Sequence, residues 1–198
     1  MTDARWNHNV EHYEVLLRAL PPHCSRVLDV GCGDGLLTRA VAERGIPVVA
    51  LDVDAGSVAT TRAEVADLDD VEVVQGDVMD PDLDLGIFDA VLSVATLHHL
   101  PLEDGLRRMS ELVAPGGVLG VVGIARSRSL WDLSHDAVGA VLARVRRRRR
   151  GWWEVTAPTR RPTTSYTRVL RVATLLLPGV RYRRHLLFRY SLVWTRPG

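Results

Sequence analysis

The fold is decided by the stretch "VLDVGCGDG", Val27 to Gly35, in which an apolar run ends in three glycines at alternate positions. Glycine is favoured where the backbone takes a positive φ or where another group must approach the main chain closely. A glycine loop between a strand and a helix lets a ligand lie against bare backbone at the N-terminus of that helix. We therefore predict that Gly31, Gly33 and Gly35 form a ligand-binding loop.

The chain on both sides of this loop alternates between short β-rich runs and longer segments of helical period. Strands are expected over 26–30, 47–53, 71–77, 88–95 and 118–125, and helices over 9–20, 36–45, 57–66 and 103–113. The residues 114–117, "APGG", are expected to form a turn before the last of these strands. Such regular alternation favours an α/β fold, a parallel sheet with helices on both faces.

The pattern changes after residue 125. A helix is expected over 129–145, capped by Ser129, with Val138, Val141, Leu142 and Val145 facing inward. A polar segment over 146–163 is followed by a helix over 165–177 that Pro178 and Gly179 end. The last two strands, 180–190 and 191–197, follow each other with almost no residues between them, so they must form an antiparallel hairpin.

The composition sets the broad class. The chain has 198 residues, of which 46% are hydrophobic and 25% charged, and this predicts a single soluble domain. Its net charge of +1 gives no general case for binding nucleic acid or a membrane. Cys24 and Cys32 are too few and too close for a disulfide framework, so a cytoplasmic location is expected. Neither a signal peptide nor a membrane span is expected, because long apolar runs are missing.

Two acids near the glycine loop indicate the kind of ligand. Asp52, at the end of the second strand, stands where an acid binds a ribose diol, about 20 residues after the glycines. The spacing of the glycines differs from the Gly-x-Gly-x-x-Gly of dinucleotide enzymes. Asp29, two residues before Gly31, would repel a phosphate and attract an ammonium group. The pattern therefore predicts a nucleoside with a cationic tail, and it argues against an NAD-dependent oxidoreductase.

The sequence resembles the class I S-adenosylmethionine-dependent methyltransferases, of the small-molecule type. The matching motifs are "VLDVGCGDG", "ALDVD", "VVQGDVMD", "FDAVLSVATLHHL" and "LVAPGGVLGVV", in order and at ordinary spacing from Val27 to Val122. The resemblance implies a Rossmann-like sheet of seven mostly parallel strands with a C-terminal antiparallel hairpin. It also implies one domain over 1–198, with an N-terminal cap helix (1–25), a cofactor-binding core (26–125), and a substrate-side insertion with the hairpin (126–198).

The resemblance assigns S-adenosylmethionine as the cofactor and S-adenosylhomocysteine as its product. The residues that it places at the cofactor are Asp29, Gly31, Cys32, Gly33, Gly35, Asp52, Val53, Asp77, Val78 and Ser93. Asp29 would attract the methionine ammonium, and Asp52 would bind the ribose hydroxyls. Val53 would pack on the adenine, Asp77 would accept from its amino group, and the Val78 N–H would donate to its ring. Ser93 would line the space where the methyl group meets the acceptor.

Residues for catalysis and acceptor binding follow from their place in this fold. His98 and His99, just after the fourth strand, are candidate bases, with helix capping and packing as the alternative. The N-terminal helix, with His8, His12 and Tyr13, either closes over the cofactor or packs on the sheet. Trp152 and Trp153 either pack on the domain or line a pocket for a hydrophobic acceptor. No metal site is predicted.

The acceptor is expected to be a small metabolite with an oxygen, nitrogen or carbon nucleophile. The residues "SVATLHH" after the fourth strand differ from the Asn/Asp-Pro-Pro-Tyr of nucleobase amine methyltransferases, and they offer no cysteine nucleophile for cytosine. The run from Arg144 to Arg150 is expected to be a solvated helix end. The alternatives are an RNA or protein methyltransferase that uses this run, and a non-catalytic module that binds the cofactor.

Overall fold

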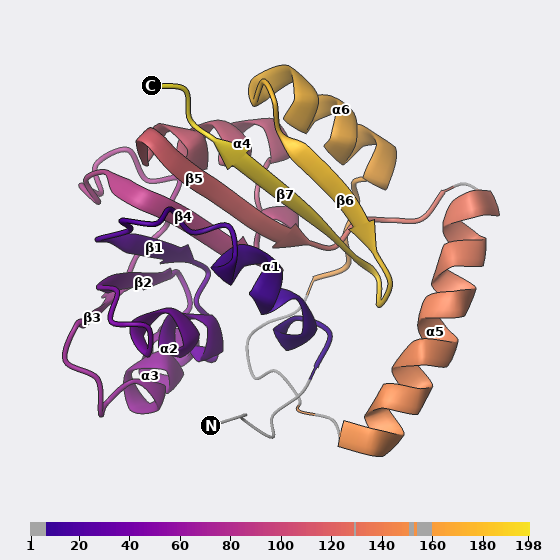
Figure 1. Ribbon diagram of the computed structural model, residues 1–198, viewed down its shortest axis with the longest axis horizontal. Helices are drawn as coiled ribbons and strands as arrows, with labels where there is room; N and C mark the ends of the chain where they lie inside the picture. Colours follow the sequence, from indigo (N-terminus) through magenta and orange to yellow (C-terminus); the bar gives the residue numbers. More distant parts are fainter. Residues whose placement is uncertain (1–6, 129, 151–152, 154–159) are drawn as a thin grey trace.

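The computed structural model describes residues 7–128, 130–150, 153 and 160–198, and a seven-stranded sheet forms its centre (Figure 1). The strands are β1 (Val27–Val30), β2 (Val48–Asp52), β3 (Val71–Gln75), β4 (Phe88–Val94), β5 (Val113–Gly123), β6 (Arg181–His185) and β7 (Arg189–Thr195), in the spatial order β3-β2-β1-β4-β5-β7-β6. β7 pairs antiparallel with β5 and β6, and the pairs among β1 to β5 are parallel. This confirms the mostly parallel sheet with a C-terminal antiparallel hairpin.

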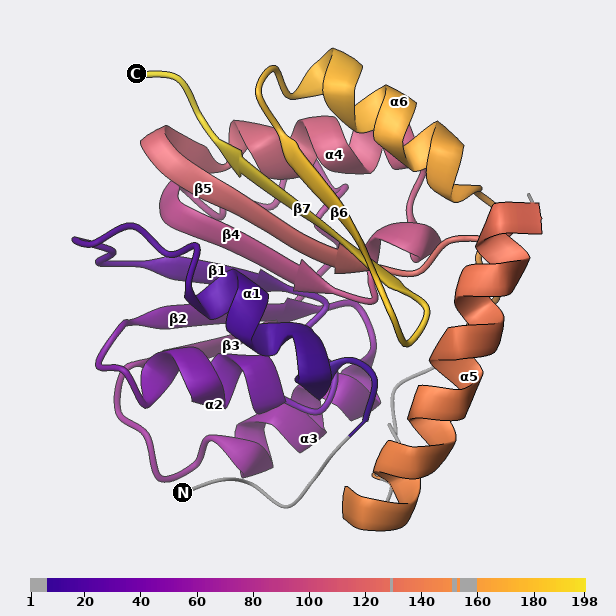
Figure 2. The same ribbon diagram turned by 45° about the vertical axis from the view of Figure 1, so that its right-hand side comes forward.

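Helices cover both faces of the sheet, as predicted (Figure 2). They are the 3₁₀ helix η1 (Val10–His12), α1 (Tyr13–Leu17), α2 (Leu36–Ala42), α3 (Ala55–Glu64), the 3₁₀ helix η2 (Leu97–His99), α4 (Leu102–Glu111), α5 (Leu130–Arg150) and α6 (Tyr166–Leu176). One face carries α1, α2 and α3, and the other carries α4 and α6. Ser165 caps α6, because its hydroxyl accepts a hydrogen bond from the Arg168 N–H.

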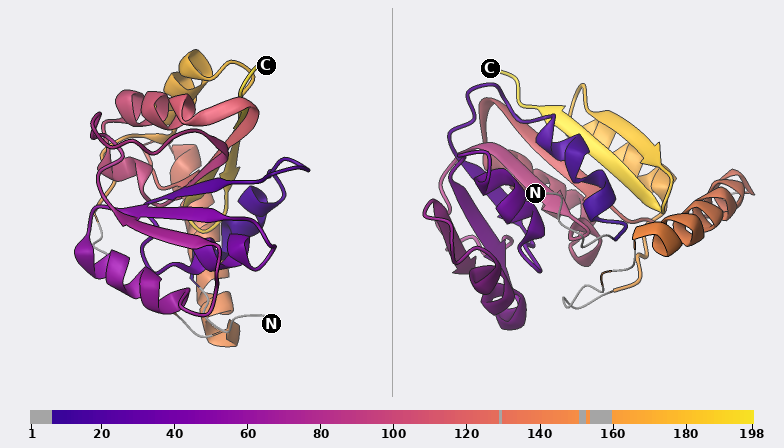
Figure 3. Two further views of the ribbon diagram at one scale, coloured as in Figure 1. Left: turned by 90° about the vertical axis from the view of Figure 1, so that its left-hand side faces the viewer. Right: turned by 60° about the horizontal axis from the view of Figure 1, so that its bottom comes forward.

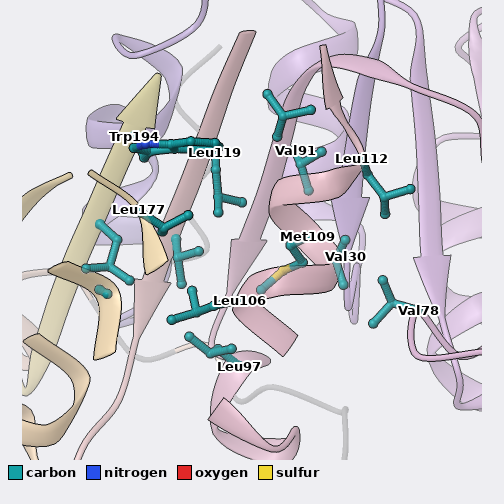
Figure 4. Close-up of a cluster of buried hydrophobic side chains, with 14 of the residues drawn as sticks. Val30, Val78, Val91, Leu97, Leu106, Met109, Leu112, Leu119, Leu177 and Trp194 are labelled. Atoms are coloured by element: carbon teal, nitrogen blue, oxygen red, sulfur yellow. The ribbon is translucent and has the colours of Figure 1, made fainter. Parts of the chain in front are cut away.

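Two apolar clusters hold these layers together. The larger one joins α4 and α6 to the sheet, with Leu106, Met109, Leu119 and Trp194 all buried (Figure 4). The smaller cluster lies on the opposite face around Leu16 of α1. Fully burying one such side chain stabilises the fold by about 1.5–3 kcal/mol. This packing fixes the sheet whose carboxyl-terminal edge carries the candidate site.

The hairpin turn lies earlier in the chain than the sequence predicted. β6 ends at His185 and β7 begins at Arg189, so the predicted boundary between residues 190 and 191 is wrong. Leu187 and Phe188 take positive φ values of 64° and 63° in the turn. Glycine or asparagine ordinarily takes such positions, and their absence concealed the turn. The predicted "APGG" turn is likewise part of β5, in which the pairing with β4 is irregular.

The helix α5 differs most from expectation. It continues to Arg150, five residues beyond its predicted end, and it lies beside the sheet next to the β6–β7 turn (Figures 1 and 3). The predicted inward orientation of Val138, Val141 and Val145 is wrong, because their exposed fractions are 57%, 67% and 42%. Leu142 is half-buried. The predicted cap Ser129 lies outside the described residues.

The opposite side of α5 makes the contacts with the domain. Asp132 and Asp136 each form a 2.9 Å ion pair with Arg184 of β6. Gly139 approaches the turn so closely that an added Cβ would lie 3.3 Å from the Leu187 nitrogen. The contacts that hold this helix against β6 and the β6–β7 turn are therefore made by charged groups and a glycine rather than by valines. None of the helices in the described residues is long and apolar enough to cross a membrane.

Candidate functional site

The three glycines of the loop after β1 all take positive φ, with values of 75°, 55° and 76° at Gly31, Gly33 and Gly35. An added Cβ at Gly31 would lie 2.1 Å from the Thr96 Oγ1 atom. At Gly35 it would lie 3.1 Å from the Thr61 Cα atom. Part of the requirement for glycine thus comes from the protein itself, since the backbone conformation and these two threonines leave no room for a side chain.

Hydrogen bonds fix this loop against the end of β2. The Gly33 N–H donates to the Asp52 carboxylate at 3.0 Å, and the Asp54 N–H donates to its other oxygen at 3.0 Å. The Thr61 hydroxyl of α3 donates to the Gly33 carbonyl at 2.9 Å. The Gly31 N–H donates to the Leu51 carbonyl at 2.7 Å. The structure therefore brings Asp52 and the glycine loop into one rigid arrangement at the carboxyl-terminal edge of the sheet.

Asp29 lies beneath this loop, near the end of β1, and is 1% exposed. Its carboxyl group accepts one side-chain hydrogen bond, from the Thr38 hydroxyl at 2.7 Å. Burial raises the pKa of Asp29 to about 7, and the negative charge of Asp52 adds to this effect. A buried carboxyl group of this kind favours a positively charged neighbour, because a cation would stabilise its ionised form.

The residues expected at an adenine ring lie after β2 and β3. Val53, next to Asp52, has 66% of its surface exposed. Asp77 is exposed, and one of its carboxylate oxygens accepts from the Met79 N–H at 2.9 Å. The Val78 side chain is buried, and no described group accepts a hydrogen bond from its N–H. These groups are available to a ligand at the same edge.

Two further residues of the expected cofactor set are buried in protein contacts. Ser93 is fully buried, and its hydroxyl donates to the Val30 carbonyl at 3.0 Å, which joins β4 to β1. Cys32 is 7% exposed, and its Sγ lies 3.3 Å from the Thr61 hydroxyl oxygen. Burial, reinforced by Asp29, raises the pKa of Cys32 to about 12. Both side chains support the loop and the strands around it.

His98 and His99 form the last part of η2, directly after β4, with ring centroids 4.2 Å apart. The turn that carries them begins at Ala95, whose φ of 55° is rare for a residue with a side chain. Burial lowers the pKa of His98 to about 4, with the neighbouring His99 as the second cause. The His98 Nδ1 atom is buried and has no hydrogen-bond partner among the described residues. His98 is therefore a neutral ring at pH 7.

The candidate acceptor residues come from two distant segments. The His8 ring lies 5.7 Å from the Phe188 ring in the hairpin turn, and burial lowers the pKa of His8 to about 4. Tyr13 packs with α1 on the smaller apolar cluster. The Trp153 Nε1 atom donates to the Asp34 carboxylate at 3.4 Å, which places this tryptophan at the glycine loop. Trp152 lies outside the described residues.

Three threonines that shape this site were not among the residues predicted from the sequence. Thr96 faces Gly31 across 65 residues of chain, and Thr61 supports Gly33 and Gly35 across 28 and 26 residues. Thr38 is the hydrogen-bond donor to Asp29. The position of Thr96 just after a predicted strand was the one available signal, since loops at that edge carry function in parallel sheets.

Comparison with known proteins agrees with this geometry. A family model described as a methyltransferase domain matches residues 27–117. A methyltransferase of Mycobacterium tuberculosis, itself uncharacterised, is 37% identical over 201 residues, which cover 98% of this chain and 99% of that protein. The ubiquinone biosynthesis O-methyltransferase of Xanthomonas axonopodis pv. citri is 34% identical over 140 residues, which cover 67% of this chain and 56% of that protein.

A solved structure supports the fold. The N-methyltransferase NodS from Bradyrhizobium japonicum WM9, in complex with S-adenosyl-L-homocysteine, superposes with a TM-score of 0.63. The match covers 96% of this chain and 88% of that chain, at 16% sequence identity. At this identity the likeness concerns the fold, which the two chains share over nearly their whole lengths.

Proposed function

Because the chain belongs to the class I S-adenosylmethionine-dependent methyltransferases, we propose that it methylates an oxygen, nitrogen or carbon nucleophile of a small metabolite. The acceptor is hydrophobic if Trp152 and Trp153 line its pocket. One observation carries the proposal: the hydrogen bond from the Gly33 N–H to Asp52, which joins the glycine loop and the acid of β2 into one site.

The residues at this site suit S-adenosylmethionine. The buried carboxyl group of Asp29 would attract the methionine ammonium, and the Asp52 carboxylate, held by two backbone N–H groups, would accept from the ribose hydroxyls. The exposed Val53 side chain would pack on the adenine. Asp77 would accept from the adenine amino group, and the Val78 N–H would donate to the ring.

The chemistry requires little from the protein beyond positioning. When bound, S-adenosylmethionine supplies a methyl group already activated by its sulfonium. The residues around the site hold the acceptor in line with that group, and positioning of this kind can contribute ~7–11 kcal/mol to catalysis. A base is needed where the nucleophile carries a proton. His98, a neutral ring with a pKa of about 4, would accept that proton weakly, and His99 beside it is the second candidate.

The test measures where the methyl group goes. The protein is incubated with methyl-labelled S-adenosylmethionine and, separately, with small-molecule, RNA and protein fractions of a cell extract. Label in the small-molecule fraction, lost in the Asp52→Ala variant, would support the proposal. Label in RNA or protein would instead favour the alternative in which exposed arginines such as Arg147 and Arg148 hold an anionic macromolecule. Binding of the cofactor without any transfer would favour a non-catalytic module.

A further inference from the structure

The β6–β7 hairpin carries two buried arginines with opposite surroundings. The Arg184 side chain is 7% exposed, and its guanidinium pairs with the carboxylates of Asp132 and Asp136 at 2.9 Å each. Arg189 is 9% exposed, and no carboxylate pairs with it anywhere in the described residues. Charges in protein interiors are normally paired, because removing an ion from water is costly. Within the part of the chain that the structure describes, Arg189 therefore has no counter-ion.

Uncharged oxygens supply the contacts of Arg189. The Nε and Nη2 atoms donate to the Asn9 side-chain oxygen at 3.0 and 2.8 Å, and Nη1 donates to the Phe188 carbonyl at 3.3 Å. An arginine has five N–H donors. These contacts use three, so one N–H on each Nη atom is left for another acceptor. Two such donors on one guanidinium can donate to the two oxygens of a carboxylate.

The strand topology places Arg189 at the edge of the sheet that carries the cofactor loop. Tyr190 pairs with Gly123, the last residue of β5, so Arg189 lies one residue beyond the carboxyl-terminal end of that strand. β1, β2 and β4 end at the same edge. The glycine loop follows β1, Asp52 is the last residue of β2, and the η2 turn follows β4. Figure 2 shows the β6–β7 turn beside the carboxyl-terminal ends of β4 and β5.

The electrostatic surroundings agree with this position. After burial, the charge of Arg189 is among the causes that lower the pKa values of His8, His12 and His98. His8 and His98 belong to the expected acceptor and base residues, so the guanidinium lies close to them. Burial also lowers the pKa of Arg189 itself, to about 10, which leaves the side chain charged at pH 7.

We propose that Arg189 binds a carboxylate of the methyl acceptor, so that the acceptor is an organic acid whose nucleophile is positioned by this ion pair. The inference rests on the proposed methyltransferase function and adds the chemical class of the substrate. A ligand carboxylate supplies the counter-ion that the described residues do not provide, and it forms two charge-assisted hydrogen bonds. An uncharged analogue would leave the cation buried and unpaired, so the site discriminates strongly against it.

The test uses the full chain loaded with S-adenosylhomocysteine, with thermal unfolding at pH 7 and constant ionic strength as the readout. Acetate, succinate and benzoate are each compared with the corresponding amide, and inorganic phosphate forms a separate arm. At ten times its Kd a ligand raises Tm by roughly 3–6 °C for a domain of this size. We expect at least one carboxylate to give such a shift while its amide gives none.

The variants Arg189→Met and Arg189→Lys test whether the Arg189 guanidinium causes the Tm shift produced by carboxylates. Arg189→Met should keep the shift caused by S-adenosylhomocysteine but weaken carboxylate binding at least tenfold, and Arg189→Lys should restore part of the binding. Arg184→Met is the matched control: it removes the ion pairs of Arg184 with Asp132 and Asp136 and should lower Tm of the free protein more than Arg189→Met does.

Three results would overturn the inference. They are the absence of any carboxylate response in the loaded wild type, an equal response in Arg189→Met, and a response to phosphate but to no carboxylate. If S-adenosylhomocysteine itself failed to shift Tm of the wild type, the proposed function would fail first, and the two failures would be distinguishable.

Discussion

The buried carboxyl group of Asp29 leads to a measurable prediction for the substitution Asp29→Asn. Burial raises the pKa of this group from 3.8 to about 7 in the folded protein. A difference of about 3 in pKa, at 1.36 kcal/mol for each unit, corresponds to roughly 4 kcal/mol. The asparagine keeps an oxygen that can accept the hydrogen bond from Thr38, but it has no ionised form to destabilise the interior.

Proton linkage gives the direction in which the free energy of unfolding changes with pH. Between pH 3.8 and about 7 the folded state holds a proton on Asp29 that the unfolded state has lost, so the free energy of unfolding falls as pH rises through this window. The variant lacks this loss. Urea unfolding at pH 5, 6, 7 and 8 should therefore show that the free energy of unfolding of Asp29→Asn rises relative to that of the wild type as pH increases. Between pH 5 and pH 8 this relative gain should be roughly 2.5 kcal/mol, because the rest of the difference already develops below pH 5.

Asp89→Asn is the control for this series. Asp89 accepts from the Ser25 N–H and hydroxyl, and its pKa is lowered, so it stabilises the fold above its ordinary pKa and loses that contribution in acid. Its variant should show a nearly constant deficit from pH 5 to 8. A difference between wild type and Asp29→Asn that is also constant over this range would contradict a raised pKa for Asp29 in the folded protein.

Cofactor binding gives a second readout for the same residue. If the methionine ammonium binds the ionised form of Asp29, the affinity of the wild type for S-adenosylhomocysteine should rise about 15-fold between pH 5.5 and 7.0. The amino group of the ligand stays protonated over this range, since such groups titrate at about pH 8. Asp29→Asn should bind weakly at every pH, and calorimetric titration of both proteins measures the difference.

Three further predictions concern the loop, α5 and the η2 turn. In urea unfolding, Gly31→Ala should lower the free energy of unfolding by roughly 1–3 kcal/mol more than Gly116→Ala does. Both glycines have positive φ, but only at Gly31 does the added methyl group clash with a side chain. Equal losses in the two variants would contradict this prediction. The pair Val138→Ser and Val141→Ser should change stability by less than about 1 kcal/mol, since both side chains are exposed, and a larger loss would show that this face is covered. Titration of His98 by NMR should give a pKa near 4, and a value near 6.5 would place the ring in solvent.

Much of the fold could be predicted from the sequence. The alternation of apolar runs and helical periods identified the strands and helices of the sheet, and the two successive strands at the end predicted the antiparallel pair. The turn at Leu187 and Phe188 could not be located, because it contains no glycine, asparagine or proline. The valines of α5 were predicted to face inward, but they face solvent. Periodicity indicates that a helix has an apolar and a polar face, but it does not show which face packs on the domain. In α5 the packed face is the one that carries the ion pairs with Arg184.

The sequence motifs of the site could be predicted, but the side chains that pack against these motifs could not. The glycine loop, Asp29 and Asp52 stand in recognisable local patterns, whereas the need for glycine at position 31 arises from Thr96, a contact that only the folded chain reveals. The same holds for Arg189. In the sequence it is one of 25 basic residues. Only a comparison of the described charges around Arg184 and Arg189 reveals that no described carboxylate pairs with Arg189.

The most direct test of the account is thermal unfolding with and without S-adenosylhomocysteine, on the wild type and on Asp52→Ala. A ligand at 100 times its Kd adds about 2.7 kcal/mol to the free energy of unfolding, which raises Tm by roughly 5–11 °C for a domain of this size. We expect that shift in the wild type and its near loss in Asp52→Ala. No shift in the wild type, with NADH tried alongside, would contradict it.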